Sequence, residues 1–204
     1  PEDIKSVDDL YKLPFLTKDD LREAYPYGLV AAPLSDCVRI QSTSGTTGRR
    51  VVAFYTQHDL DLWEDCCARA ITAAGGTKDD VCQVSYGYGL FTGALGLHYG
   101  LEKVGATVIP ASSGNTEKQL MMFRDFGVTG LVATPSYALY LSEAMKESGY
   151  PKEAYKLRLG ILGSEPCTPE MRKQIEENMG IYVSDNYGLT EIGGPGVLSL
   201  IHIS

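Results

Sequence analysis

The chain has 204 residues, 44% of them hydrophobic and 22% charged, which is typical of one large globular domain or part of one. Its formal net charge of −8 argues against nucleic acid as the main partner, because phosphate contacts require clustered Lys and Arg. With no apolar run of membrane-spanning length and five cysteines that show neither disulfide nor zinc spacing, we expect a cytoplasmic protein with no membrane partner.

Residues 1–36 are predicted to form a helical or irregular lead-in. The first residue is Pro1 and no signal-peptide pattern follows, so we expect the chain to begin inside a longer protein. Thr17 is suited to cap a short helix that starts at Lys18.

A loop rich in glycine and hydroxyl residues lies between two strand-like segments, 38–40 and 51–56. Its sequence is Ser42-Thr43-Ser44-Gly45-Thr46-Thr47-Gly48-Arg49-Arg50. Glycine lets the backbone approach a ligand, and hydroxyl, backbone N–H and guanidinium groups donate to phosphate oxygens. The segment therefore predicts a nucleotide phosphate loop. The alternative is a polar turn between two strands, although a hairpin needs only a two-residue link.

The rest of the chain alternates between predicted strands and helices. Further strands are predicted at 81–86, 106–110, 129–133, 157–162 and 181–184. Helices are predicted at 58–74, 92–104, 115–126, 136–147 and after the capping residue Thr168. Such alternation with short links predicts an α/β fold with a doubly wound, mainly parallel sheet flanked by helices.

Three predicted strand ends carry glycine together with an aromatic or acidic residue, at 86–93, 163–166 and 185–191. Ligands bind outside the carboxyl ends of such strands. The aromatic residues could instead belong to the core, although the glycines between them open space. Glu165 and Glu191 could be solvated acids, and Glu191 beside Thr190 could equally bind Mg²⁺.

Together these motifs resemble the adenylate-forming enzymes, the superfamily that includes the acyl-CoA synthetases. Residues 44–48 resemble its phosphate loop, and residues 187–191 resemble its second signature. Within the superfamily the chain is most similar to the phenylacetate–CoA ligase family. The narrower resemblance rests on residues 13–22, 86–93, 163–166 and 194–197. It implies that 37–197 form the ATP- and acyl-binding α/β region of a large amino-terminal domain.

The resemblance implies a two-step reaction with ATP, Mg²⁺ and CoA. ATP and an arylacetic acid give an acyl-adenylate and pyrophosphate, and the CoA thiol then displaces AMP. It also implies small-molecule partners only and a homodimer. An adenylating ligase for another aromatic or aliphatic acid, or a non-catalytic nucleotide-binding module, remains an alternative.

The resemblance also implies roles for individual residues. The phosphates would be held by Ser42, Thr43, Ser44, Gly45, Thr46, Thr47, Gly48 and Arg49. The nucleotide wall would consist of Gly163, Ser164, Glu165, Pro166, Asp185, Asn186, Tyr187 and Gly188. The aryl pocket would be lined by Tyr86, Gly87, Tyr88, Phe91 and Gly93. The catalytic residues would be Thr190 and Glu191, with Glu191 as the metal ligand.

Two departures from the family pattern stand out. Arg49 and Arg50 occupy the positions where the family usually has Lys-Pro. The later ribose-binding acid and the small carboxy-terminal domain with its catalytic lysine are not among these residues, so we expect little ligase activity from this polypeptide alone. Residues 198–204 do not resemble the family, and we interpret them as an atypical tail at a sequence junction.

Overall fold

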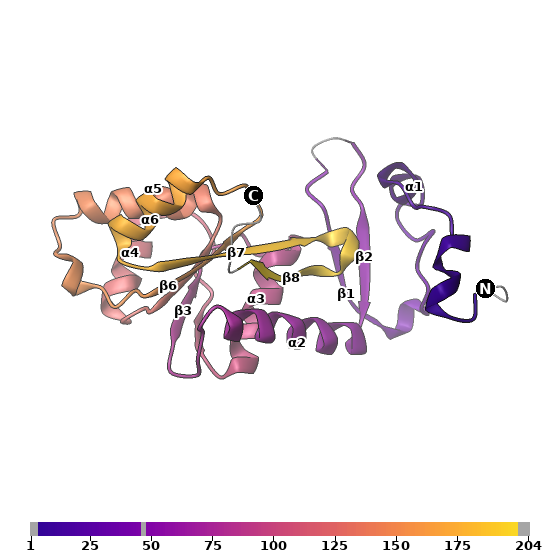
Figure 1. The fold of residues 1–204 in the computed structure, drawn as a ribbon, viewed down its shortest axis with the longest axis horizontal. Coiled ribbons are helices and arrows are strands. Elements are labelled where there is room, and N and C mark those ends of the chain that lie inside the picture. Colours follow the sequence, from indigo (N-terminus) through magenta and orange to yellow (C-terminus); the bar gives the residue numbers. More distant parts are fainter. Residues whose placement is uncertain (1–3, 46–47, 200–204) are drawn as a thin grey trace.

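The computed structural model describes residues 4–45 and 48–199, with side-chain surroundings up to Gly193. A six-stranded sheet, in the order β4-β3-β5-β6-β7-β8, forms its centre, and a two-stranded sheet of β1 and β2 lies beside it (Figure 1). The strands are β1 (Cys37–Ser42), β2 (Val52–Thr56), β3 (Val81–Val84), β4 (Thr107–Ile109), β5 (Gly130–Ala133), β6 (Leu159–Gly163), β7 (Tyr182–Leu189) and β8 (Gly194–Ser199).

Helices cover both faces of the central sheet, which confirms the predicted doubly wound α/β class. The α-helices are α1 (Lys18–Glu23), α2 (Gln57–Ala73), α3 (Thr92–Val104), α4 (Thr116–Asp125), α5 (Pro135–Glu147) and α6 (Pro169–Met179). Figure 1 shows α4, α5 and α6 above the sheet and α2 and α3 below it. Strands β4, β3, β5, β6 and β7 run parallel, and only β8 pairs antiparallel, at the edge beside β7.

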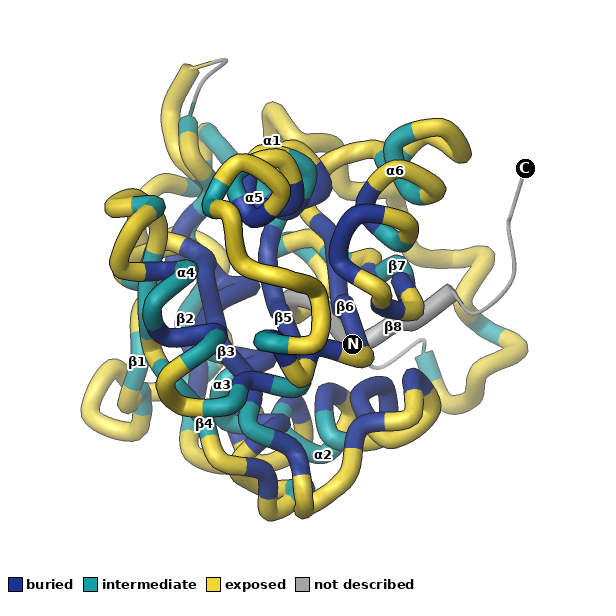
Figure 2. Tube along the Cα trace, turned by 90° about the vertical axis from the view of Figure 1, so that its left-hand side faces the viewer, coloured by how far each residue is buried: buried dark blue, intermediate teal, exposed yellow. Residues whose placement is uncertain are grey.

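Two apolar clusters, one on each face of the sheet, hold these layers together. Leu131 and Ala133 of β5 belong to the cluster beneath α4, α5 and α6, whereas Val132 belongs to the cluster beneath α2 and α3. The alternation follows from the two-residue period of a strand. All four residues of β5 are buried, as expected of a central parallel strand, and the buried sheet is visible in Figure 2.

Side-chain caps set where most of the helices begin. The Thr17 and Thr168 hydroxyls accept hydrogen bonds from the third backbone N–H of α1 and α6, which confirms both predicted caps. Thr56, Asn115 and Thr134 cap α2, α4 and α5 in the same way. Each cap satisfies a backbone donor that the helix leaves free, so the sequence located these starts within about two residues.

The observed strands differ from the predicted ones, or add to them, in three respects. Strands β1 and β2 pair antiparallel as a separate hairpin and do not join the parallel sheet. Residues 185–189, which we expected beyond the end of a strand, continue β7 because β8 folds back and pairs with them. Strand β8 itself was not predicted. Its segment is rich in glycine and proline, so only the partner strand stabilises its extended form.

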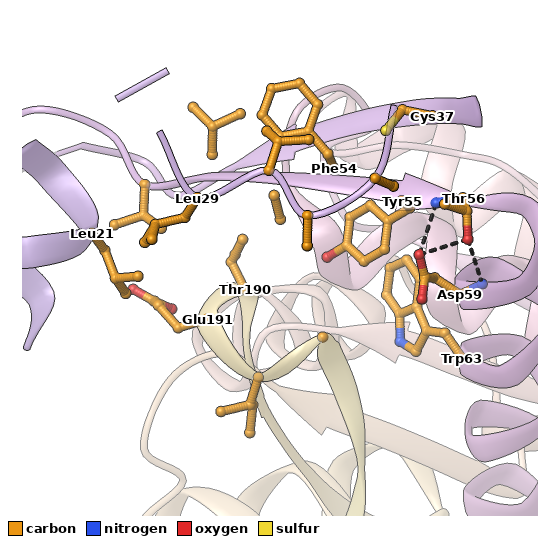
Figure 3. A pocket seen from close by; sticks show the side chains of 18 of the residues that line it. Leu21, Leu29, Cys37, Phe54, Tyr55, Thr56, Asp59, Trp63, Thr190 and Glu191 are labelled. Atoms are coloured by element: carbon orange, nitrogen blue, oxygen red, sulfur yellow. Dashed lines mark hydrogen bonds between the residues drawn. The ribbon is translucent and has the colours of Figure 1, made fainter. Parts of the chain in front are cut away.

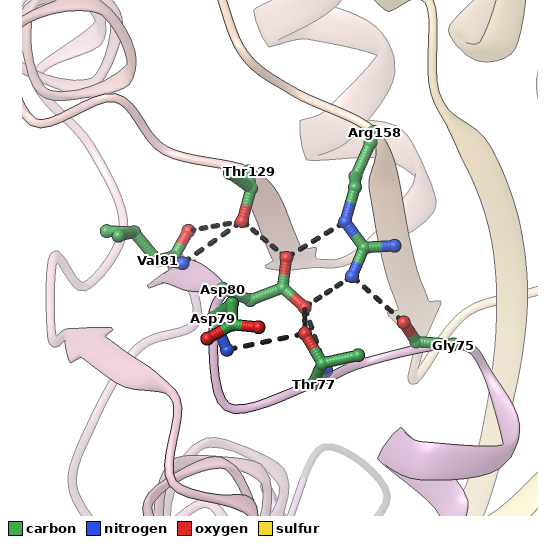
Figure 4. A network of polar contacts seen from close by, with 7 residues as sticks. All are labelled: Gly75, Thr77, Asp79, Asp80, Val81, Thr129 and Arg158. Carbon is green, nitrogen blue, oxygen red and sulfur yellow. Dashed lines mark hydrogen bonds and ion pairs between the residues drawn. The ribbon is translucent and has the colours of Figure 1, made fainter.

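A polar network ties together the amino ends of three neighbouring parallel strands (Figure 4). Asp80 precedes β3 and is 3% exposed. It accepts hydrogen bonds from Thr129, which precedes β5, at 2.6 Å and from Nε of Arg158, which precedes β6, at 2.9 Å. Burial alone would raise the pKa of Asp80, but the bonds from Arg158, Thr129 and Thr77 lower it overall. The network fixes the sheet edge opposite the candidate site.

Among the described residues, none of the helices combines the length and apolarity needed to cross a membrane.

Candidate functional site

The predicted phosphate loop is the tip of the β1–β2 hairpin. Thr46 and Thr47 lie outside the described residues, but the rest of the loop is placed. Gly45 and Gly48 have φ values of 72° and 137°, a region that favours glycine. Gly48 N–H donates to Gly45 O at 3.3 Å. The segment is therefore a turn between two strands and also a long, glycine-bent loop, and its role in holding nucleotide phosphates stays a prediction.

Internal hydrogen bonds close the base of this loop, and the described residues Ser44, Gly48 and Arg49 are exposed. Thr43 N–H donates to Val51 O at 3.0 Å, and Val51 N–H donates to the Thr43 hydroxyl at 3.1 Å. Arg50 Nη1 donates to Ser42 Oγ and to Thr43 O, both at 3.4 Å. Arg50 thus stabilises the base of the loop, whereas the exposed Arg49 remains a candidate for contact with phosphate.

The base of the loop is bonded to the segment that follows β3. Ser42 N–H donates to Leu90 O at 2.9 Å, and Gln41 Nε2 donates to Phe91 O at 3.2 Å. The candidate phosphate loop and the candidate aryl segment, some 50 residues apart in sequence, are therefore directly connected.

The candidate aryl wall is partly built from buried aromatic surface. Tyr86 is 3% exposed and packs against Phe91, with ring centroids 5.6 Å apart. A Cβ on Gly93 would lie 2.7 Å from the Phe91 ring, so glycine at this position lets the ring lie flat against the helix start. Burial raises the pKa of Tyr86 to about 12, opposed by the neighbouring Ser164 and Gly163. The Tyr86 hydroxyl therefore stays protonated at neutral pH and lies close to the end of β6.

Tyr88 is held by a histidine that we did not single out from the sequence. Its hydroxyl lies 2.9 Å from His98 Nδ1, and His98 Nε2 lies 3.2 Å from a Glu102 carboxylate oxygen. Burial raises the pKa of Tyr88. Gly87, by contrast, is exposed and nearly free of neighbours. The sequence signal was present as the four-residue spacing of His98 and Glu102 on a helix, but the partner Tyr88 lies on a loop.

The ends of β6 and β7 meet as the candidate nucleotide wall. A Cβ on Gly163 would collide with the carbonyl oxygen of Asn186, so only glycine fits there. Ser164 adopts φ 70°, which turns the chain sharply out of the strand. Glu165 accepts hydrogen bonds from the Ser136 hydroxyl at 2.6 Å and from the Ser136 N–H at 3.3 Å. The Glu165 carboxylate is therefore not simply a solvated acid, because it caps the start of α5. Pro166 follows and is exposed.

The part of this wall contributed by β7 contains one fixed acid and one exposed ring. Asp185 pairs with the Arg172 guanidinium of α6, which also donates to Val183 O. Tyr187 is 59% exposed, so a face of its ring is available for stacking. Asn186 is buried, and Gly188 pairs with Pro195 of β8. We did not single out Arg172 as a site residue, because its partner Asp185 lies on a strand 13 residues away.

Thr190 and Glu191 lie in a short 3-10 turn after β7, close to both other candidate regions. The Thr190 hydroxyl is 3.3 Å from the hydroxyl of Thr92, the first residue of α3. Glu191 is paired with Lys18 of the lead-in helix, Nζ to Oε1 3.1 Å. Within the described residues no group of three or more His, Cys, Asp or Glu side chains is arranged to hold a metal ion. One carboxylate beside a hydroxyl still fits Mg²⁺, which usually takes few protein ligands when phosphates supply others.

Several buried polar atoms around this edge have no hydrogen-bond partner among the described residues. They include Gln41 Oε1, Ser184 Oγ and Asn186 Oδ1. Such groups are rare in folded proteins, because each loses its bond to water without compensation. They lie at the carboxyl end of β1 and within the part of β7 that pairs with β6, and unpartnered polar atoms there are the pattern expected where a polar ligand or water completes the site.

A pocket among the described residues lies elsewhere. It has a volume of about 640 Å³ and is enclosed by the lead-in, β2, the start of α2 and the turn after β7 (Figure 3). Its wall includes Leu21, Phe54 and Trp63. Of the predicted site residues only Thr190 and Glu191 line it, so Tyr86, Gly87, Tyr88, Phe91 and Gly93 are not brought into this pocket.

Comparison with known proteins agrees with this geometry. The family described as "AMP-binding enzyme" matches residues 4–202. Phenylacetate-coenzyme A ligases of Pseudomonas putida and Escherichia coli strain K12 are 52% and 50% identical to the chain, over 97% of its length. The chain covers 45% of each, so it spans about half the length of these relatives.

The fold has similar solved structures as well. A 2-hydroxyisobutyryl-CoA ligase in complex with 2-HIB-AMP and CoA has a TM-score of 0.85 and 27% identity, covering 94% of this chain and 43% of that one. ATP-bound MatB from Rhodopseudomonas palustris shares the fold with a TM-score of 0.64 and 22% identity, covering 82% of this chain and 32% of that one. The converging motifs, the fold and the family match together place this chain in the AMP-binding enzyme family.

Proposed function

We propose that the whole enzyme activates an arylacetic acid with ATP and transfers the acyl group to CoA. The observation that carries the proposal is the convergence of the phosphate loop, the aryl segment and the turn at Thr190 through direct hydrogen-bonding contacts. The names of the relatives at about 50% identity support phenylacetate as the reference acid.

A carboxylate becomes reactive only when one of its oxygens is converted to a leaving group. In the proposed first step the carboxylate oxygen attacks the α-phosphorus of ATP, and the bond to pyrophosphate breaks. The loop donors from Ser44 to Arg49 would hold the β- and γ-phosphates and offset their charge. Tyr86 and Phe91 would seat the aromatic ring against apolar surface. The CoA sulfur then attacks the acyl carbon, and AMP departs with the electron pair of the broken C–O bond.

We propose that Glu191 would hold Mg²⁺ together with the nucleotide phosphates, and that Thr190 would contact the α-phosphate. The metal, when bound, neutralises phosphate charge. The carboxylate already attracts a cation, Lys18, which supports this assignment. Tyr187 would stack on adenine, and the backbone at 163–166 would flank it.

The test is acid-dependent pyrophosphate release by an enzyme of the relatives' full length that carries this sequence, hereafter the full-length enzyme. Phenylacetate, a hydroxylated phenylacetate, indoleacetate and an aliphatic acid would be compared, with CoA thioester measured in parallel. Release and thioester formation with the arylacetates are expected. Preference for the aliphatic acid would replace the substrate assignment. Binding of ATP without acid-dependent release would indicate a non-catalytic nucleotide-binding module.

A homodimeric state and a cytoplasmic location also belong to the proposal. Sedimentation of the full-length enzyme and fractionation of its host cells would test them, and a monomer or a membrane-bound enzyme would overturn the corresponding statement.

A further inference from the structure

The segment Leu90-Phe91-Thr92, hereafter the junction segment, contacts three parts of the candidate site. Leu90 O accepts from Ser42 N–H at 2.9 Å, and Phe91 O accepts from Gln41 Nε2 at 3.2 Å. The Thr92 hydroxyl is 3.3 Å from that of Thr190. The same three residues therefore touch the base of the phosphate loop, the aryl wall and the turn that contains Glu191.

Of the residues that contact the junction segment, Gln41 is the one whose side-chain type is least expected at its position. Its side chain is fully buried, yet only its amide nitrogen is bonded, and Oε1 has no partner among the described residues. A buried amide oxygen without a hydrogen bond lowers stability, so an apolar side chain of similar size would suit the fold better. Among the described residues, the hydrogen bond of the Gln41 side chain goes to the backbone that carries the Phe91 ring.

We propose that Gln41 is a positioning residue that couples nucleotide binding to acid binding through the junction segment. Gln41 directly precedes the phosphate loop and Ser42 is its first residue, so the loop conformation that binds ATP also fixes the carbonyls of Leu90 and Phe91. Because these carbonyls are fixed, the Phe91 ring of the aryl wall is in position before the acid binds. By thermodynamic reciprocity the acid strengthens ATP binding by the same factor. The inference rests on the proposed function and deepens it.

The experiment measures this coupling without turnover. The full-length enzyme is titrated calorimetrically with the non-cleavable α,β-methylene analogue of ATP, with and without saturating phenylacetate. The ratio of the two dissociation constants is the coupling factor. In Gln41→Met the factor is expected to fall by about two- to tenfold, the range that corresponds to one hydrogen bond. Urea denaturation of the same variant is expected to show equal or greater stability.

Gln57→Met serves as the matched control, because that glutamine is exposed and, among the described residues, its side chain bonds Asp61 on its own helix. It should leave the coupling factor unchanged. An unchanged factor in Gln41→Met would overturn the inference while leaving the proposed function intact. A variant that loses stability and binds both ligands weakly, with the coupling factor retained, would make Gln41 purely structural and would also overturn it. Failure of the unaltered enzyme to bind either ligand would overturn the proposed function itself.

Discussion

Polar residues at the amino edge of the sheet have a different role from those toward its carboxyl edge. At the amino edge the Asp80 carboxylate is almost completely buried and fully bonded, whereas toward the carboxyl edge several buried polar atoms have no partner within the described part of the chain. The first arrangement stabilises the fold, and the second suits a place where a ligand completes the bonding.

Asp80→Asn is expected to lower stability by about 1–3 kcal/mol at neutral pH, because the Arg158 and Thr129 donors lose a charged acceptor. The folded-state pKa of Asp80 is lowered, so its contribution is present above the unfolded pKa, near 3.8, and is lost as the pH falls through the folded value. Urea denaturation from pH 7 to pH 2.5 would measure how the difference in free energy of unfolding between the unaltered protein and Asp80→Asn changes with pH.

Asp79→Asn is the control for this measurement, because the adjacent Asp79 is 79% exposed and pairs only with the exposed Lys78. It is expected to change stability by less than about 0.5 kcal/mol. Equal effects of the two substitutions at neutral pH would contradict the assigned role of Asp80.

Glu165 was predicted to belong to the nucleotide wall, and the structure shows that it also caps α5. The substitution Glu165→Ala tests this capping role. The Glu165 carboxylate bonds Ser136 at the positive end of α5, so its loss is expected to cost about 1 kcal/mol. Glu147→Ala, at the negative end of the same helix, should be neutral or stabilising. Thermal denaturation at low salt would compare them, and the same sign for both would rule out a capping role.

At the scale of elements, α2 and α3 pack unusually closely because α3 presents glycines to its neighbour. A Cβ on Gly100 would lie 2.6 Å from Cys67 Cβ and 3.0 Å from Ile71 Cδ1, both on α2. The sequence predicted a helix of small residues here, but the reason for their size is the contact with α2.

The substitution Gly100→Ala tests whether helix propensity or packing against α2 determines the change in stability at this position. Propensity alone predicts a gain of about 1 kcal/mol, whereas the crowded contact predicts a loss of about 1–3 kcal/mol. We expect the loss, measured by urea denaturation. A gain in stability would mean that α2 and α3 separate at little cost.

At the scale of the whole molecule, the chain contains the candidate site's converging segments but spans under half of its relatives' length. We expect the 204-residue polypeptide to form no phenylacetyl-CoA above background when supplied with ATP, Mg²⁺, phenylacetate and CoA. The assay is chromatographic detection of the thioester, with the full-length enzyme as positive control. Robust thioester formation by the polypeptide would show that these residues suffice for both steps.

The sequence by itself determined the fold class, most helix starts and the order of the motifs. These properties depend on local signals, namely hydrophobic periodicity, capping hydroxyls such as Thr168, and glycine-rich loops. The sequence also identified the residues of the candidate site. The roles of those residues stay predictions.

The tertiary structure alone decided which of those groups meet. Strand β8 forms because β7 offers it a partner, and Glu165 caps α5 because two distant strand ends lie side by side. The buried Gln41 bond to Phe91, 50 residues away, has no periodic or local signal. Long-range contacts depend on the closure of the whole sheet, and one sequence without its fold does not specify which distant side chains that closure brings together.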